Sequence, residues 1–134
     1  MENVLVPIDG SDPALDALSF AFDRFPEADV HVLHVVQVDE FPDDPNIRPI
    51  EYAEKRASEF ISDARSRAEE HGCEITTAIE HGHPGKTIIS YTEQHDIDHI
   101  VIGSRGRTGS SRVLLGSVAE LVARRSPVPV TIAR

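Results

Sequence analysis

The chain has 134 residues, of which 40% are hydrophobic, and its formal net charge at pH 7 is −10. That length is typical of one domain with one core, so we expect residues 1–134 to form a single domain. The acidic balance argues against nucleic acid or anionic lipid as a general partner, and no apolar run has the length of a membrane span.

Apolar β-branched runs alternate along the chain with amphipathic segments, a pattern typical of a parallel sheet flanked by helices. In chain order we expect strand 3–8, helix 12–24, strand 30–36, helix 51–71, strand 74–79, helix 84–95, strand 97–102, helix 117–125 and strand 128–132. Ser11 is placed to cap the first helix, and Gly72 to end the second. Proline and acid over residues 39–49 predict an exposed loop. Pro127 and Pro129 suit a strand at the edge of the sheet.

The order of the strands follows from how such units connect. Right-handed crossovers leave few arrangements for five parallel strands, and the common doubly wound one has the order 3-2-1-4-5. The predicted fold class is therefore α/β, with a doubly wound five-stranded parallel sheet. In this order the first and fourth strands are neighbours, so Asp9 lies beside the segment that follows the fourth strand. Doubly wound folds bind ligands at this switch point, where the direction of winding reverses.

The segment after the fourth predicted strand has an unusual composition. Residues 99–119 contain no acid, although the chain has 23 acidic residues, and they include four glycines and three arginines. The glycines allow backbone N–H groups to approach an anion closely, and Gly116 with Ser117 opens a helix whose free N–H groups attract phosphate. The pattern predicts an anion site. The alternative is that these glycines form only a flexible turn and a helix cap.

The motif Gly103-x2-Gly106-x9-Gly116-Ser117 resembles the nucleotide-binding motif of the universal stress protein family, in the branch whose members bind ATP. The similarity covers essentially the whole chain, from the opening strand to the closing one. Each piece of the pattern is weak alone, but together the pieces are specific.

The resemblance implies a flavodoxin-like, Rossmann-like domain that binds ATP at the switch point. It also implies a homodimer formed through the last strand, Val128 to Ile132. We expect Mg²⁺ or Mn²⁺ to be held by the nucleotide's phosphates, and we assign no metal ligand to the protein. Asp9 and the backbone of Val35 are placed at the adenine and ribose end. The residues expected to contact the nucleotide are Pro7, Ile8, Asp9, Val35, Gly103, Arg105, Gly106, Gly116, Ser117 and Val118.

Two of these assignments have plainer alternatives. Asp9 precedes a Gly-Ser pair, which is also typical of a strand-to-helix turn. Arg105, like Arg107 and Arg112, either contacts phosphate or pairs with acids on the surface. Both interpretations of each residue stay open at this point.

Other patterns are set aside. Residues 82–87 are similar to the end of a phosphate-binding P-loop, but Glu80 stands where that motif needs a glycine. His31 and His34 lie three apart on a strand, hence on opposite faces. No closed zinc pattern is formed by the remaining candidates, His71, Cys73, His81 and His83.

The sequence offers no group placed as a general base toward a γ-phosphate, so we assign no catalytic residue and expect at most slow ATP hydrolysis. The leading hypothesis is a cytoplasmic ATP-binding protein of the stress response, in which nucleotide occupancy biases the dimer or a partner surface. The alternatives are a slow ATP hydrolase or phosphotransferase, and a structural adaptor that binds no nucleotide. A lone cysteine and no secretion signal favour the cytoplasm. Many acids with few lysines indicate either a halophilic source or a genome that codes arginine for lysine.

Overall fold

A parallel sheet organises the fold in the computed structural model, which describes residues 2–37, 44–104 and 115–134. In this part of the chain five strands form one sheet in the order β3-β2-β1-β4-β5, which confirms the predicted fold class and strand order. The strands are β1 (Asn3–Pro7), β2 (Asp29–Val36), β3 (Ile75–His81), β4 (His99–Gly103) and β5 (Val130–Ala133). The helices are α1 (Asp12–Arg24), α2 (Pro49–Glu70), α3 (Pro84–Gln94) and α4 (Ser117–Arg125).

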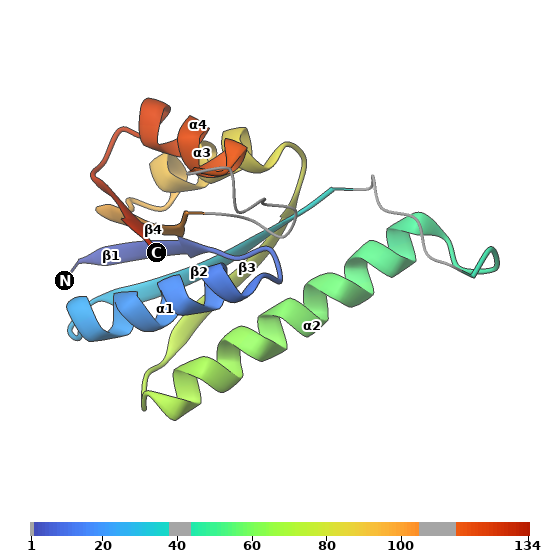
Figure 1. The fold of residues 1–134 in the computed structure, drawn as a ribbon, viewed down its shortest axis with the longest axis horizontal. Coiled ribbons are helices and arrows are strands. Elements are labelled where there is room, and N and C mark those ends of the chain that lie inside the picture. Colours follow the sequence, from blue (N-terminus) through green and yellow to red (C-terminus); the bar gives the residue numbers. More distant parts are fainter. Residues whose placement is uncertain (1, 38–43, 105–114) are drawn as a thin grey trace.

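Helices α1 and α2 cover one face of the sheet, and α3 and α4 cover the other (Figure 1). Successive residues of β1 point to opposite faces, so Val4 and Val6 pack with α1 and α2, whereas Leu5 packs with α3 and α4. All three side chains are fully buried, which confirms the predicted central position of β1. Burial of each such side chain contributes about 1.5–3 kcal/mol. The buried middle of the sheet therefore stabilises the ends of the strands from which the turns begin.

The ends of several elements differ from the predicted ones because pairing or proline decides them. Strand β3 extends to His81, since it pairs with β2 as far as Val36. Helix α2 begins at Pro49, because the fixed φ and missing N–H of proline suit the first turn of a helix. Strand β5 begins only at Val130, because Pro129 has no N–H to donate to a ladder. It lies at the edge of the sheet, as predicted.

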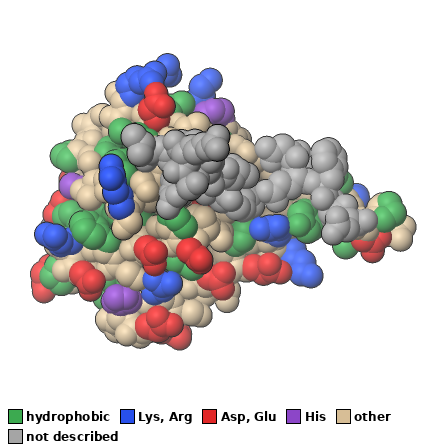
Figure 2. All heavy atoms as spheres, in the orientation of Figure 1, with side chains coloured by type: hydrophobic (Ala, Val, Ile, Leu, Met, Phe, Trp, Pro, Cys, Tyr) green, Lys and Arg blue, Asp and Glu red, His purple; other side chains and the backbone are tan. Residues whose placement is uncertain are grey.

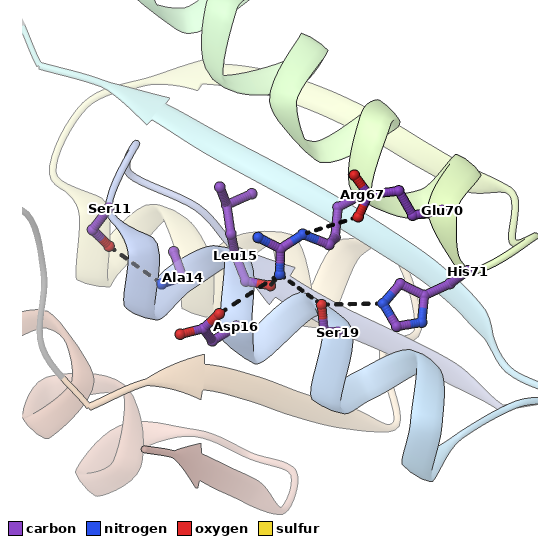
Figure 3. A network of polar contacts seen from close by, with 8 residues as sticks. All are labelled: Ser11, Ala14, Leu15, Asp16, Ser19, Arg67, Glu70 and His71. Carbon is purple, nitrogen blue, oxygen red and sulfur yellow. Dashed lines mark hydrogen bonds and ion pairs between the residues drawn. The ribbon is translucent and has the colours of Figure 1, made fainter.

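A polar network fixes α2 against α1 (Figure 3). Arg67 of α2 donates from Nη1 to the Ser19 hydroxyl at 2.8 Å and to the Leu15 carbonyl at 3.3 Å. The Ser19 hydroxyl also lies 3.2 Å from Nε2 of His71, which follows the last residue of α2. Because a helix is stiff, anchoring its C-terminal end also fixes the direction of its N-terminal half, which extends beyond the sheet (Figure 1).

Acidic side chains are spread over the face formed by α1 and α2, with basic side chains between them (Figure 2). Exposed pairs of this kind contribute little to stability individually. Among the residues that the structure describes, no helix combines the length and the apolar composition needed to cross a membrane.

Candidate functional site

The chain reverses its winding between β1 and β4. These strands are neighbours, with Val4 opposite His99 and Leu5 opposite Ile100. Strand β1 leads into α1 on one face of the sheet, whereas β4 is followed by α4 on the other face (Figure 1). Doubly wound folds bind ligands where two such connections diverge from the carboxyl edge of the sheet. The carboxyl edge of the sheet between the β1–α1 turn and the start of α4, called the crevice below, is therefore the candidate site.

Side chains close the turn that follows β1. Oδ1 of Asp9 accepts hydrogen bonds from the Ser11 N–H at 3.0 Å and from the Ser11 hydroxyl at 2.5 Å. Ser11 Oγ in turn accepts from the Ala14 N–H at 3.3 Å, which caps α1 as predicted. Asp9 thus has the turn role that the plainer alternative gave it. Because a carboxylate accepts several hydrogen bonds, this role is compatible with contact to a ligand.

An aromatic side chain of α2 lies against this turn. Gly10 has a φ of +87°, and a Cβ at that position would lie 2.3 Å from Cε1 of Phe60, so only glycine fits. The Phe60 ring meets the His34 ring edge-on, with centroids 5.0 Å apart. His34 Nδ1 lies 2.9 Å from the Ile8 carbonyl oxygen, and because a carbonyl only accepts, Nδ1 carries the proton. The end of β1 is therefore held by β2 and α2 together.

The backbone of Val35 faces the side of β2 on which β1 has ended. The Leu33 carbonyl accepts a hydrogen bond from the Ile8 N–H, toward β1. The Val36 carbonyl accepts one from the Gly82 N–H, toward β3. Since the peptide groups of a strand alternate between its two sides, those of Val35 point toward β1, beyond its last paired residue. The Val35 side chain is buried, as predicted, so a binding role rests on its peptide groups.

The opposite wall of the crevice begins at the end of β4. A Cβ on Gly103 would lie 2.9 Å from the carbonyl oxygen of Pro13 in the first turn of α1. That contact is with backbone, which cannot rotate away, so the close approach requires glycine. The Ser104 N–H donates to the Ala133 carbonyl at 3.0 Å, and the Gly116 N–H donates to the Ser104 carbonyl at 2.6 Å. These bonds hold the start of α4 next to the end of β4.

Helix α4 begins without a side-chain cap in the part of the chain that the structure describes. Gly116 is the N-cap residue, with φ −66° and ψ 157°, which are extended values that any residue adopts. Ser117 is exposed, and Val118 is half-buried against the core under α3 and α4. The first N–H groups of a helix have no partner within the helix, and such an end attracts anions.

The structure places eight of the ten predicted contacts on the two walls of this crevice. At the ends of β1 and β2 lie Pro7, Ile8, Asp9 and Val35. At the end of β4 and the start of α4 lie Gly103, Gly116, Ser117 and Val118. Arg105 and Gly106 lie outside the described residues, as do Arg107 and Arg112, and all ten contact assignments stay predictions.

Sequence reasoning missed the residues of α2 and β2 that border the β1–α1 turn. They are His34 and Phe60, and Arg56 and Tyr52 continue from Phe60 as a row along α2. The spacing of four between the three α2 residues indicates one helical face. The sequence alone does not say which part of the sheet that face meets, because the contact with Gly10 joins segments that are far apart in the chain.

The strand order and the two faces of helices define a doubly wound α/β protein. The family model of the Universal stress protein family matches residues 1–134, and the chain belongs to this family. The resemblance found in the sequence is therefore confirmed.

The sequences and structures of related proteins align with nearly the whole length of this chain. Universal stress protein MJ0531 of Methanocaldococcus jannaschii is 34% identical over 139 residues, which cover 99% of this chain and 82% of that protein. Universal stress protein UspA from Lactobacillus plantarum superposes with a TM-score of 0.84 at 30% identity, over 99% of this chain and 97% of that one. The universal stress protein from Archaeoglobus fulgidus in complex with dAMP gives a TM-score of 0.73 at 25% identity, over 100% and 98% of the two chains.

Proposed function

We propose that this chain binds an adenine nucleotide, ATP above all, in the crevice at the switch point. The observation that carries the proposal is the start of α4, which no described side chain caps and which lies across the crevice from the Asp9 turn. A helix N-terminus of this kind favours phosphate through its N–H groups and its dipole. The Archaeoglobus fulgidus relative, which holds dAMP, supports an adenine nucleotide as the ligand.

The two walls suggest the orientation of the nucleotide. Phosphates belong at α4 and Gly103, where backbone approaches closely and N–H groups lie at a helix end. The adenine and ribose belong at the ends of β1 and β2. There the peptide N–H and C=O of Val35 point in one direction, a donor and an acceptor that match N1 and the amino group of adenine. We expect the Asp9 carboxylate, which already accepts from Ser11, to accept a further hydrogen bond from a ribose hydroxyl.

A divalent ion, Mg²⁺ or Mn²⁺, fits this site only as a companion of the nucleotide. Among the described residues no group of three or more His, Cys, Asp or Glu is arranged to hold a metal ion. Mg²⁺ commonly keeps several waters and is held by phosphates with one or two carboxylates, so the phosphates of ATP would be its main ligands. The ion would neutralise phosphate charge in a chain whose own net charge is −10.

Calorimetric titration with ATP and Mg²⁺ tests the proposed binding. The experiment belongs in high salt, because self-repulsion of an acidic surface is screened there. We expect a dissociation constant of about micromolar, which corresponds to about −8 kcal/mol. Asp9→Ala and Gly116→Val should each weaken binding about tenfold or more, whereas Arg65→Ala, which removes an exposed α2 side chain that contacts Thr77 of β3, should not. No heat of binding, or equal affinity in all four proteins, would contradict the proposal.

The same samples separate the alternatives. Sustained, metal-dependent release of phosphate by purified protein would favour the ATP hydrolase or phosphotransferase. Unfolding that is insensitive to adenine nucleotides would favour the adaptor, since a ligand that binds only the folded state must raise its stability. We place the protein in the cytoplasm, where ATP is available to such a switch.

We further propose that the chain forms a homodimer through its last strand and that nucleotide occupancy biases this dimer or a partner surface. The carbonyls of Pro129 and Ala133 accept hydrogen bonds from β4 and from Ser104 just after it, so the alternating peptide groups of Val130 and Ile132 point away from the sheet. A row of outward peptide groups on an edge strand suits pairing with a second copy across a twofold axis.

Light scattering in high salt, with and without ATP, tests the dimer and the switch. We expect twice the monomer mass for the wild type and a dimer affinity that changes with ATP. Ile132→Pro removes an outward N–H and should give a monomer, with circular dichroism as the check on folding. A monomeric wild type would exclude the dimer, and a dimer affinity that ATP leaves unchanged would exclude the switch through dimerisation.

A further inference from the structure

The feature that carries a further inference is a row of three side chains on α2. Tyr52, Arg56 and Phe60 are spaced by four residues and therefore lie on one helical face. The Arg56 guanidinium lies 5.7 Å from the Tyr52 ring centroid and 5.2 Å from the Phe60 ring centroid, and its Nη1 donates to the Tyr52 hydroxyl at 3.0 Å. Two rings and a hydroxyl thus hold this half-buried cation in one place.

The contacts of Phe60 show where the row lies relative to the carboxyl edge of the sheet. Phe60 contacts Gly10 in the turn after β1 and meets His34 at the end of β2, so it lies at the level of the carboxyl edge. Helix α2 enters from that edge and leaves toward the start of β3. With a rise of about 1.5 Å per residue, Arg56 lies about 6 Å above Phe60, which is the height of a ligand resting on the edge of the sheet.

The row lies on one particular side of the crevice. That side determines which part of a bound nucleotide the row would contact. Ala53 and Ala57 of α2 pack with Val36 of β2, which places this half of the helix on the β2 side of the switch point. The start of α4, where we place the phosphates, lies on the β4 side and on the opposite face of the sheet (Figure 1). The row therefore borders the base and ribose end.

We propose that Arg56 contacts the base of the bound nucleotide, with Tyr52 and Phe60 as positioning residues; this inference rests on the proposed function. A guanidinium is flat, always charged and weakly hydrated, so it stacks on an aromatic ring and also donates to ring nitrogens. A purine offers both partners. A cation fixed at this end also offsets the repulsion between an acidic protein and an anionic ligand.

The test compares the affinities of ATP and AMP for the wild type, Arg56→Ala, Arg56→Lys and the control Arg65→Ala, which removes the same charge from α2 away from the row. A contact with the base is common to both ligands, so Arg56→Ala should weaken ATP and AMP by the same factor, about tenfold. Arg56→Lys should recover only part of the loss, because an ammonium does not stack. Arg65→Ala should bind both ligands as the wild type does.

Each other outcome overturns the inference in a distinct way. A loss with Arg56→Ala that is larger for ATP than for AMP would place Arg56 at the β- and γ-phosphates, which AMP lacks. Unchanged affinities in Arg56→Ala, together with weaker binding in Asp9→Ala, would remove Arg56 from the site and leave the proposed function intact. A wild type that binds neither nucleotide would reject the proposed function itself. Thermal unfolding of Arg56→Ala separates a lost contact from a misfolded variant. Tyr52→Phe keeps the ring but removes the hydroxyl that accepts from Arg56, so it should weaken ATP and AMP by the same factor, about twofold.

Discussion

Two helices begin at the crevice, and their N-termini are built differently. At α1, Asp9 holds Ser11 and Ser11 caps the helix, so side chains of the chain itself satisfy the turn. At α4, Gly116 is the N-cap residue and no described side chain caps the helix. In the proposed binding mode the contrast separates the two ends of the nucleotide, because side-chain acceptors gather at one wall and backbone donors at the other. Each wall can be tested against a matched position elsewhere in the chain.

The largest effect on stability is expected at Gly10, in the α1 wall. Gly10→Ala forces a side chain into a left-handed conformation and against the buried Phe60 ring, so the free energy of unfolding should fall by about 3 kcal/mol. Gly72 has a φ of +64° with nothing within 4 Å of its Cβ position, so Gly72→Ala should cost only about 1 kcal/mol. Urea unfolding of both variants measures the difference. Equal losses would show that the Phe60 contact does not constrain the turn.

A smaller effect is expected where β4 approaches α1. Gly103→Ala directs a Cβ into the Pro13 carbonyl and should lower the free energy of unfolding by about 2 kcal/mol. Gly85 is the comparison, because its Cβ would meet the end of the Leu121 side chain at 2.7 Å, which can turn aside. Alanine is also the better helix former, so Gly85→Ala should change stability by less than about 1 kcal/mol. A larger loss at Gly85 than at Gly103 would mean that the Pro13 carbonyl does not constrain the α4 wall.

The two serines at the helix starts compare the walls directly. Ser11→Ala removes a cap and should lower the free energy of unfolding by about 1 kcal/mol. Ser117 is exposed and follows the N-cap, so Ser117→Ala should stay within about 0.5 kcal/mol of the wild type while weakening ATP binding several-fold. Denaturation and titration of both variants supply the two readouts. Loss of stability without loss of affinity at Ser117 would mean that α4 is capped like α1.

The smallest effect concerns pH and lies away from the crevice. Burial, followed by the nearby His95, lowers the pKa of His31 below its ordinary value, although Asp29 acts in the opposite direction. The unfolded chain then binds a proton at His31 that the folded protein does not, so this histidine destabilises the fold as pH falls below about 6.5.

The matched variant His31→Gln isolates this contribution. The difference in unfolding free energy between wild type and variant should stay constant above about pH 7. Below about pH 6.5 the wild type should lose stability relative to the variant. The variant loses the 2.9 Å contact between His31 Nδ1 and the Tyr91 hydroxyl at every pH. This loss changes the difference in unfolding free energy by a constant amount near neutral pH and adds no pH dependence there. A difference that does not vary from pH 8 to about pH 5 would contradict the lowered pKa.

The sequence was sufficient to predict the strand order, because alternating elements and right-handed crossovers leave few topologies. It also identified Asp9 and Ser11, since turn and cap chemistry acts between neighbouring residues. The sequence did not predict that position 10 requires glycine. That need comes from Phe60, fifty residues later, and only the packing of α2 on the sheet brings the two together. The proposed role of Arg56 depends on the same packing, so the sequence alone did not suggest it.

The glycine pattern divides in a similar way. Gly103, the last residue of β4, is required because the backbone of Pro13 in α1 approaches it closely. Gly116 has an ordinary extended conformation, so its role depends on what approaches the helix end, which the fold alone does not determine. The ten contact assignments stay predictions, and two of these residues, Arg105 and Gly106, lie outside the described part of the chain.

Photolabelling with 8-azido-ATP tests the central claim most directly, because the azide is attached to the purine and marks where the base end lies. We predict labelled peptides from the β1–α1 turn, the end of β2 or the N-terminal half of α2, and suppression of the label by excess ATP. Label at the start of α4 would mean that the base lies at α4, which is the opposite of the proposed orientation of the nucleotide. No label that ATP suppresses would contradict nucleotide binding at this crevice.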